Sequence, residues 1–228
     1  MIACEESQEV CKAFRALGHD AYSCDIQECS GWHPEWHIQG DVLRVLNPSP
    51  LPLSDSCGIC FCTMEGKFHK VDRWDLIIAH PPCTYLTVAG NRWFDEKRYG
   101  DKAIQRKRDR QEAIDFFMKF VNADCEQIAI ENPIGVMSTV YRKPDQIIQP
   151  YQFGDPARKA TCLWLKGLQP LQPTNVVEPE VIRYKNGKTD DPWHYNTLSL
   201  PSKERARERS KTFPGIAKAI AEQWGKEE

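Results

Sequence analysis

Short apolar runs recur along this sequence, and polar residues or prolines follow most of them. Residues 75–79 are the plainest example, because an apolar run between polar flanks is typical of a strand buried on both faces of a parallel sheet. Further strands are expected at residues 1–4, 21–24, 127–130 and 161–165. Since helical segments separate these strands, the sequence predicts an α/β fold with an open, doubly wound sheet.

Apolar residues at helical spacing mark the segments between the strands. Val10, Phe14 and Leu17 share one face of a helix, and Gly18 follows them as a stop signal. Further helices are expected over residues 101–121, from Lys203 and from Pro214. Residues 26–40, rich in Trp, His and Gly, and the proline- and serine-rich residues 47–56 are expected to be irregular.

The bulk composition is that of an ordinary globular protein. The chain has 228 residues, 41% of them hydrophobic and 27% charged, with a net charge of −2. This predicts a single domain over residues 1–228, with a catalytic core at 1–168 and a segment at 169–228 that packs back on it. No apolar run reaches membrane-spanning length and no signal pattern opens the sequence, so a cytoplasmic protein is expected. A monomer is the separate expectation for the oligomeric state.

Four reactive side chains fall directly after expected strands or in the loop beyond them. In doubly wound sheets ligands bind beyond the carboxyl ends of the strands, so Asp25, Asp41, Cys83 and Glu131 are expected near one another. A carboxylate at Asp25 can accept hydrogen bonds from the two hydroxyls of a ribose, and Asp41 can accept one from an adenine amino group. The alternative is that both are loop or helix-cap aspartates. A GxGxxG motif is absent from the sequence, which argues against a nicotinamide or flavin cofactor.

Cys83 is the candidate nucleophile. Two prolines precede it, and they fix the backbone and place the thiol at the start of a rigid loop. A rigid, exposed thiol suits a nucleophile better than Cys11 on a helix face or Cys162 in a strand. The alternative is that Cys83 is a small apolar filler, as many cysteines are.

Two of these motifs resemble those of a known family. Residues 75–83, ending in His80-Pro81-Pro82-Cys83, resemble the nucleophile motif of DNA (cytosine-5)-methyltransferases, and residues 130–133 resemble their Glu-Asn motif. Residues 40–42 are similar to the Gly-Asp element at the adenine ring. The resemblance runs in order over residues 1–165 and extends to compact, phage- or prophage-borne DNA cytosine methyltransferases.

The resemblance implies a Rossmann-like methyltransferase sheet without a large target-recognition domain, S-adenosylmethionine as cofactor and DNA as partner. It implies that Cys83 attacks C6 of cytosine and that Glu131 acts at N3. The implied catalytic residues are Cys83, Glu131, Asn132 and Arg158. The implied cofactor-binding residues are Cys4, Glu5, Ser7, Asp25, Ile26, Asp41, Val42 and Pro81.

The sequence also departs from the family pattern. Thr84 stands where the nucleophile motif continues with Gln, Pro133 stands where the Glu-Asn motif has Val, and residues 3–8 lack the glycines of the first motif. These departures keep open the alternative of a non-catalytic nucleic-acid-binding or decoy protein. An RNA cytosine-5 methyltransferase, which the core motifs do not exclude, and an amino-group methyltransferase are the other two alternatives. An aromatic residue in place of Cys83 would favour the amino-group methyltransferase.

Two further clusters carry hypotheses of their own. Residues 96–110 hold seven basic and three acidic side chains, which predicts either contact with nucleic-acid phosphates or a solvated helix face. Cys57, Cys60, Cys62 and His69 are residue types that zinc accepts. The alternative for the latter set is a β-hairpin over residues 61–71 with its turn at Gly66.

Overall fold

A computed structural model describes residues 1–48 and 58–226 of the chain. The chain divides into two compact units. The first, here called the sheet unit, comprises Met1–Gln8, Ala21–Ile147 and Thr161–Pro170. The second unit comprises Glu9–Asp20, Ile148–Ala160 and Leu171–Glu228, so a helix near the N-terminus belongs with the C-terminal part of the chain.

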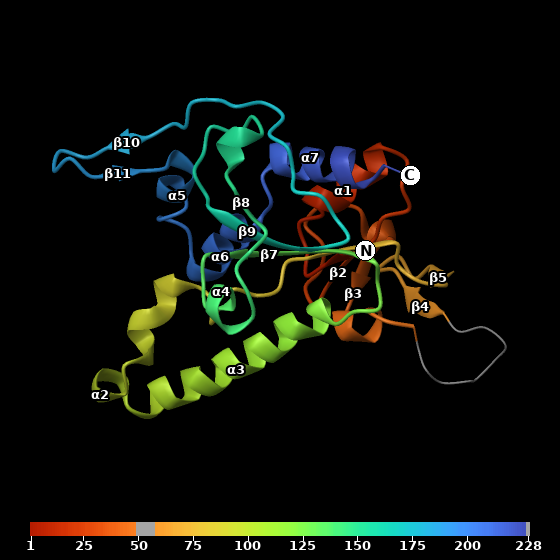
Figure 1. The fold of residues 1–228 in the computed structure, drawn as a ribbon, viewed down its shortest axis with the longest axis horizontal. Helices are drawn as coiled ribbons and strands as arrows, with labels where there is room; N and C mark the ends of the chain where they lie inside the picture. The colour runs from red at the N-terminus through yellow and green to blue at the C-terminus, as the bar shows by residue number, and fades with distance from the viewer. Residues whose placement is uncertain (49–57, 227–228) are drawn as a thin grey trace. The chain divides into compact units, whose positions relative to one another are not determined.

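A seven-stranded sheet forms the centre of the fold, in the order β3-β2-β1-β6-β7-β9-β8 (Figure 1). The strands are β1 (Ile2–Ala3), β2 (Ser23–Asp25), β3 (His37–Gln39), β6 (Leu76–Ala79), β7 (Gln127–Pro133), β8 (Gln146–Ile148) and β9 (Thr161–Lys166). Pairing is parallel from β3 through β2, β1 and β6 to β7, whereas β9 pairs with β7 in the antiparallel direction. The predicted α/β fold with a mostly parallel sheet is confirmed, and this sheet is compatible with a Rossmann-like fold.

The strand order defines where a ligand can enter. The chain runs from β1 outward to β2 and β3, and then returns to place β6 on the other side of β1. In open α/β sheets the crevice at such a reversal, outside the carboxyl ends of the strands, is the usual ligand site. Because β3, β2, β1, β6 and β7 are parallel, their carboxyl ends lie along one edge of the sheet.

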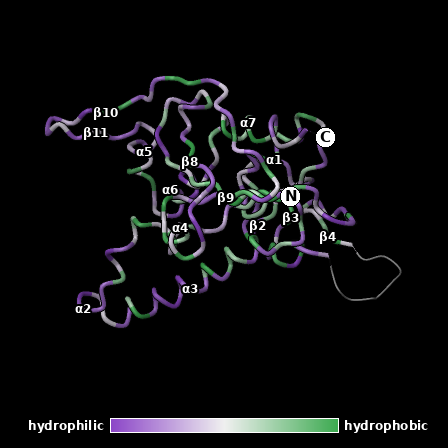
Figure 2. The backbone as a smooth tube through the Cα atoms, in the orientation of Figure 1, coloured by the Kyte–Doolittle hydropathy of each residue, from purple (hydrophilic) through white to green (hydrophobic). Residues whose placement is uncertain are grey.

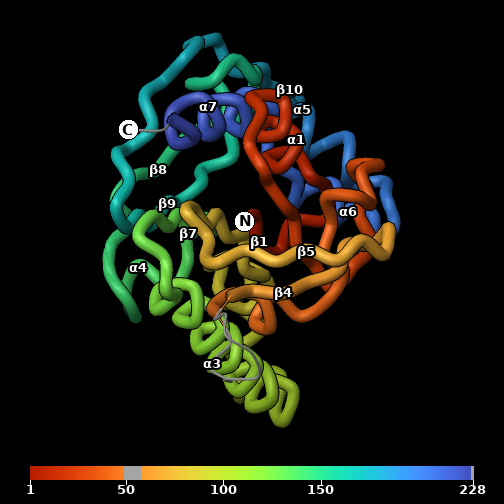
Figure 3. Tube along the Cα trace, turned by 90° about the vertical axis from the view of Figure 1, so that its right-hand side faces the viewer, coloured from red at the N-terminus to blue at the C-terminus, as the bar shows by residue number. Residues whose placement is uncertain are grey.

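Helix α3 (Asp101–Val121) supplies much of the packing on the sheet and confirms the longest predicted helix. Its C-terminal half buries Ile114, Phe117 and Phe120, and the Phe117 ring meets the Trp164 ring edge to face, with centroids 5.3 Å apart. Its N-terminal half buries Ala103 alone among the helix's first 13 residues and extends away from the sheet together with α2 (Glu96–Tyr99) (Figures 1 and 3). The α2 segment is hydrophilic (Figure 2).

The remaining elements of the sheet unit are short. They are η1 (Pro34–Trp36), η2 (Val42–Arg44), β4 (Ile59–Cys62), β5 (Phe68–Val71), η3 (Val88–Phe94) and α4 (Met137–Val140). Strands β4 and β5 form the predicted hairpin, and Gly66 has a left-handed φ of 87° in its turn. The hairpin prediction is therefore confirmed.

The second unit is built mainly from helices. Its elements are α1 (Glu9–Ala16), η4 (Pro150–Gln152), β10 (Ile182–Arg183), β11 (Thr189–Asp190), α5 (Pro192–Asn196), α6 (Ser202–Ser210) and α7 (Pro214–Trp224). Helices α1 and α7 lie side by side (Figure 3), and a Cβ added at Gly225 would lie 3.2 Å from the Phe14 ring. The helices predicted from Lys203 and Pro214 are confirmed.

Three sequence expectations need correction or fall outside the structure. Leu17 does not join the buried face of α1, because the helix ends at Ala16 and Leu17 is 51% exposed. Residues 26–40 are not wholly irregular, since they contain η1 and β3. The irregular segment expected at 47–56 lies mostly within residues 49–57, outside the described residues.

Among the helices of the described residues, none is both long and apolar enough for a membrane span.

Candidate active site

Cys83 lies in a loop that leaves the carboxyl end of β6, here called the nucleophile loop (residues 80–88). Pro81 is buried, whereas Cys83 is exposed. The carbonyl oxygen of Cys83 accepts hydrogen bonds from the N–H groups of Leu86 and Thr87, each at 3.0 Å. This turn fixes the backbone at Cys83 and leaves its thiol at the surface.

Glu131 and Asn132 lie beside the nucleophile loop, because β7 continues past the end of β6. Strand β6 ends at Ala79, which pairs with Ile130, while β7 runs on to Pro133 against β9. The Glu131 Oε2 atom lies 2.9 Å from Nδ1 of His80. The buried Asn132 side chain donates from Nδ2 to the Pro81 carbonyl oxygen at 2.7 Å. The two motifs that were separate in the sequence are thus joined through hydrogen bonds.

Backbone contacts extend this connection. The Val136 N–H donates to the Leu86 carbonyl at 2.8 Å, and the Val88 N–H donates to the Ile134 carbonyl at 3.3 Å. Gly135 lies so close to the loop that an added Cβ would be 2.2 Å from the Leu86 oxygen. Only glycine allows this approach. The nucleophile loop and residues 131–136 therefore form one fixed assembly.

Two arginines of the basic segment 96–110 hold the nucleophile loop from helix α3. Arg106 donates from Nη2 to the Thr84 carbonyl at 3.1 Å, and Arg110 donates from Nε to the Tyr85 carbonyl at 2.8 Å. The Arg110 guanidinium also lies 3.4 Å from the centroid of the Phe94 ring. These two arginines therefore stabilise the conformation of the nucleophile loop. The exposed basic side chains of the segment are Lys97, Arg98, Lys102, Lys107 and Arg108, of which Lys107 forms an ion pair with Glu96.

The predicted cofactor acids lie at the same edge of the sheet. Asp25 is half-buried at the end of β2 and accepts a hydrogen bond from the Gln27 N–H at 2.9 Å. Burial is the main cause that raises the pKa of Asp25. Asp41 is exposed and caps η2 by accepting from the Leu43 N–H at 3.0 Å, as the alternative interpretation expected.

Asp25 and Asp41 lie close enough to the thiols of Cys4 and Cys24 for their charges to affect both thiols. Burial, together with the charges of Asp25 and Asp41, raises the pKa of Cys24 to about 12. The pKa of Cys4 is raised even further by burial, with the Asp25 charge as the next contribution. Cys4 and Cys24 are therefore protonated near neutral pH and are poor nucleophiles.

The loop after β1 is packed with side chains where the family motif has glycines. Glu5, Ser7 and Gln8 are buried, and Cys4 and Gln8 adopt left-handed φ values of 59° and 60°. Gln8 donates from Nε2 to Ser23 Oγ at 3.2 Å and to the His33 carbonyl at 2.9 Å. Left-handed non-glycine residues are strained and gather at functional sites.

His37 completes this buried network, a role that the sequence did not predict. Its Nδ1 lies 2.8 Å from Ser23 Oγ and its Nε2 lies 2.9 Å from the Gln27 carbonyl oxygen. Burial lowers the pKa of His37, so the ring is neutral at physiological pH. A lone histidine in a loop rich in aromatic residues carried no signal for this role.

The other predicted site residues differ in their surroundings. Ile26 is 75% exposed next to Asp25, whereas Val42 is buried next to Asp41. Arg158 belongs to the second unit, where its Nε lies 3.1 Å from Asp191 Oδ1. His80 was part of the quoted nucleophile motif, but its hydrogen bond with Glu131 was not anticipated.

The zinc hypothesis loses part of its ligand set. Cys60 and Cys62 are exposed on one face of β4, whereas His69 pairs in register with Phe61 and lies beside the Tyr22 hydroxyl at 3.1 Å. The alternation separates His69 from both thiols. Within residues 1–48 and 58–226 no group of three or more His, Cys, Asp or Glu side chains is placed to hold a metal ion. Cys57 lies outside the described residues.

The geometry offers an exposed thiol, a neighbouring carboxyl group held by a histidine, and a pair of acids along the same sheet edge. Such a set can support covalent catalysis next to a nucleoside-containing ligand. No model of a protein family matches this sequence, and the search of curated proteins gave no match.

Proposed function

We propose that this protein is an S-adenosylmethionine-dependent methyltransferase that modifies C5 of cytosine in DNA through a covalent adduct with Cys83. The observation that carries the proposal is the fixed assembly of the nucleophile loop and residues 131–136 beside the carboxyl ends of β6 and β7 in the mostly parallel sheet. The hydrogen bonds of Glu131 to His80 and of Asn132 to Pro81 connect a thiol-bearing loop with a carboxyl-bearing strand. This pairing of groups is what addition to a cytosine ring requires.

The residues at the sheet edge fit the nucleoside half of this cofactor. A half-buried carboxylate at Asp25 suits two ribose hydroxyls, and the exposed Ile26 offers an apolar surface beside it. Asp41 has a second carboxylate oxygen for an adenine amino group, because Oδ1 is the one that caps η2. The packed loop of Cys4, Glu5 and Ser7 would meet the methionine half.

Cys83, Glu131 and His80 account for the addition to the cytosine ring. The Cys83 thiolate adds to C6 of cytosine, and the electron pair of the C5–C6 double bond moves to make C5 nucleophilic. Glu131 stabilises the charge that develops at N3, and His80 fixes the orientation of its carboxyl group. S-adenosylmethionine, when bound, supplies an electrophilic methyl group. Transfer of the C5 proton to a solvent base then restores the C5–C6 double bond and expels the Cys83 thiolate.

The target base must leave the duplex before Cys83 can reach C6. Base flipping costs a few kcal/mol, and least where the base is unpaired. The exposed side chains of Lys97, Arg98, Lys102 and Arg108 lie on the segment that continues from the nucleophile loop. Contacts from these side chains to phosphates would hold the nucleic acid without reading its sequence.

The test is methyl transfer from cofactor carrying a labelled methyl group to DNA and to RNA of the same sequence. Wild type is compared with Cys83→Ala and with Cys60→Ala, which removes an exposed thiol on the hairpin. We expect label at cytosine C5 of DNA in wild type and Cys60→Ala, and its loss in Cys83→Ala. Label at C5 that survives Cys83→Ala, or label on an exocyclic nitrogen, would overturn the proposal. Transfer to RNA alone would reassign the substrate, and cofactor binding without any transfer would favour the decoy alternative.

A covalent trap gives a second readout. When cytosine carries fluorine at C5, there is no C5 proton to remove after methyl transfer. The elimination that would expel Cys83 is therefore blocked, and the adduct persists. We expect a denaturation-resistant complex between the protein and fluorocytosine DNA that requires Cys83 and cofactor. A complex formed equally by Cys83→Ala would contradict the assigned nucleophile.

A further inference from the structure

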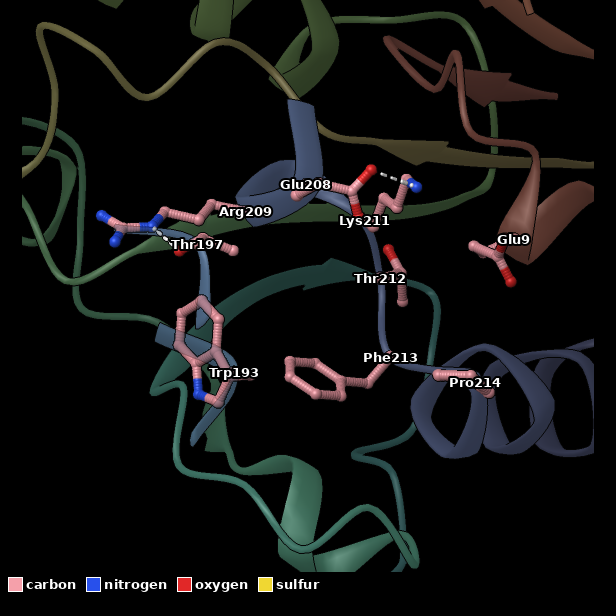
Figure 4. A pocket seen from close by; sticks show the side chains of 9 residues that line it. All are labelled: Glu9, Trp193, Thr197, Glu208, Arg209, Lys211, Thr212, Phe213 and Pro214. Atoms are coloured by element: carbon pink, nitrogen blue, oxygen red, sulfur yellow. Dashed lines mark hydrogen bonds and ion pairs between the residues drawn. The ribbon is translucent and has the colours of Figure 1, made fainter. Parts of the chain in front are cut away.

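The second unit contains a pocket of about 310 Å³ (Figure 4). Helix α5 with the residue after it, the end of α6, the start of α7 and the segment before α7 form most of its wall. The lining residues are Glu9, Trp193, Thr197, Glu208, Arg209, Lys211, Thr212, Phe213 and Pro214. The pocket thus combines two aromatic rings with two hydroxyls and four charged side chains.

The aromatic rings are held in place. Trp193 donates from Nε1 to the Arg158 carbonyl at 3.2 Å, and its ring lies perpendicular to that of Phe213 with centroids 5.9 Å apart. The Lys159 ammonium lies 6.0 Å from the Phe213 centroid and donates to the Lys211 carbonyl. Both rings are half-buried, so each keeps some surface for a ligand.

The charges of the pocket are unevenly compensated. Lys211 forms an ion pair with Glu208 at 2.7 Å, and Glu9 forms one with Lys12 at 2.9 Å. Arg209 instead donates to neutral oxygens, from Nε to Thr197 Oγ1 at 2.8 Å and from Nη2 to the His194 carbonyl at 3.2 Å (Figure 4). Burial and then the charge of Arg205 lower the pKa of Arg209, while the charge of Asp190 acts in the opposite direction, so both a second cation and an acid lie near it.

We infer that this pocket binds one nucleotide, with its base against Trp193 and Phe213 and its phosphate near Arg209. Aromatic side chains bind any base by stacking, and arginine suits phosphate through paired N–H donors. The hydroxyls of Thr197 and Thr212 offer donors and acceptors to the base or sugar. The volume lies at the lower end of the range for small-ligand pockets, as expected for a single nucleotide.

This inference goes beyond methyl transfer and does not require Cys83 to act. Inorganic phosphate would leave the aromatic walls without a function, and a neutral aromatic ligand would leave Arg209 with only neutral oxygens as hydrogen-bond partners. The nucleotide can come from a single-stranded nucleic acid or be free in solution. Both sources present the same base and phosphate.

The test is fluorescence anisotropy of a labelled single-stranded oligodeoxynucleotide, with dAMP, dCMP and inorganic phosphate as competitors. Trp193→Ala is compared with Trp193→Phe, which keeps a stacking ring, and with Trp32→Ala, which removes an 89% exposed tryptophan of the sheet unit. Arg209→Gln is compared with Arg183→Gln, which removes an exposed cation of the second unit. Circular dichroism verifies that each variant is folded.

We expect Trp193→Ala to weaken binding by about tenfold or more, with Trp193→Phe and Trp32→Ala close to wild type. Arg209→Gln should weaken binding and reduce the salt dependence by about one phosphate contact, whereas Arg183→Gln should not. Competition by dAMP or dCMP supports the site, and tight binding of these nucleotides without the oligonucleotide identifies a free nucleotide as the source.

Equal binding by folded Trp193→Ala and wild type would overturn the inference, as would competition by inorganic phosphate as strong as that by dAMP. Cys83→Ala should bind the oligonucleotide like wild type while losing methyl transfer. Failure of the pocket is therefore distinguishable from failure of the proposed methyltransferase activity.

Discussion

Replacing Asn132 by alanine should loosen the nucleophile loop without touching the thiol. Asn132 is 2% exposed and its Nδ2 donates to the Pro81 carbonyl over 2.7 Å, in a place that water does not reach. Leaving a buried carbonyl without its donor costs about 1–3 kcal/mol. Among the described residues Asn132 Oδ1 has no hydrogen-bond partner, so its removal offsets part of this cost. We therefore expect a destabilisation of about 1–2 kcal/mol.

The matched control is Asn122→Ala. Asn122 donates from Nδ2 to the Met118 carbonyl at 2.9 Å, but it is exposed, so water replaces the lost donor. In a chain of this size 1 kcal/mol corresponds to about 2–4 °C in melting temperature. Asn132→Ala should therefore melt several degrees below wild type, and Asn122→Ala should lie much closer to it.

The activity readout separates positioning from folding. A misplacement of about 1 Å at a catalytic group can cost about 100-fold in rate, so Asn132→Ala should lose at least tenfold in methyl transfer at a temperature where it is folded. Equal melting temperatures for the Asn132 and Asn122 variants would refute the burial argument. Unchanged methyl transfer in Asn132→Ala would refute the positioning role.

Three further predictions use other contacts. Gly135→Ala places a Cβ 2.2 Å from the Leu86 carbonyl, so it should lower the melting temperature and abolish methyl transfer, and a wild-type melting curve would contradict this. Burial lowers the pKa of His37, so the unfolded chain takes up this proton first and stability falls as the pH drops through about 6.5. The loss of melting temperature between about pH 7.5 and pH 5.5 should be smaller in His37→Gln. Iodoacetamide should alkylate the exposed Cys83 well before Cys24, whose pKa is about 12, and peptide mass spectrometry that finds the reverse order would oppose this picture.

The ends of these strands were predictable from the sequence because each is defined by residues that are neighbours in the sequence. Apolar runs define the strands, and parallel pairing brings their carboxyl ends to one edge, so Asp25, Cys83 and Glu131 could be placed before any coordinates. The hairpin turn at Gly66 and the helix that buries Phe117 follow from equally local patterns. These predictions needed no knowledge of which strands are neighbours.

The features that escaped prediction depend on partners distant in the sequence. Strand β3 is three residues long and begins with a buried histidine, so it has no apolar run. The extension of β7 through Asn132 exists because β9 pairs with it in the antiparallel direction. Leu17 has helical spacing but lies beyond the last turn of α1. In each case a tertiary contact or a helix end outweighed the local pattern.

The basic segment 96–110 shows how one pattern can serve two purposes. Arg106 and Arg110, four residues apart on α3, face the nucleophile loop and bind the carbonyls of Thr84 and Tyr85. Exposed cations of the same segment face solvent. A charge pattern alone cannot separate these groups, since both have the same composition and only contacts distinguish them.

The cysteines of this chain show why environment, not residue type, selects a nucleophile. Cys162 lies in register with Asn132, next to the proposed catalytic pair, yet burial and then the charge of Glu131 raise its pKa to about 11. The carboxyl group that would support chemistry on a bound base thus adds to the effect of burial, and together they keep the Cys162 thiol protonated. Cys83 is held at the surface by contacts of its loop with residues 131–136 and with α3. The proposed reaction requires that weakening those contacts lowers methyl transfer while Cys83 itself is unchanged. This result would distinguish a thiol that the loop positions for catalysis from one that is only exposed.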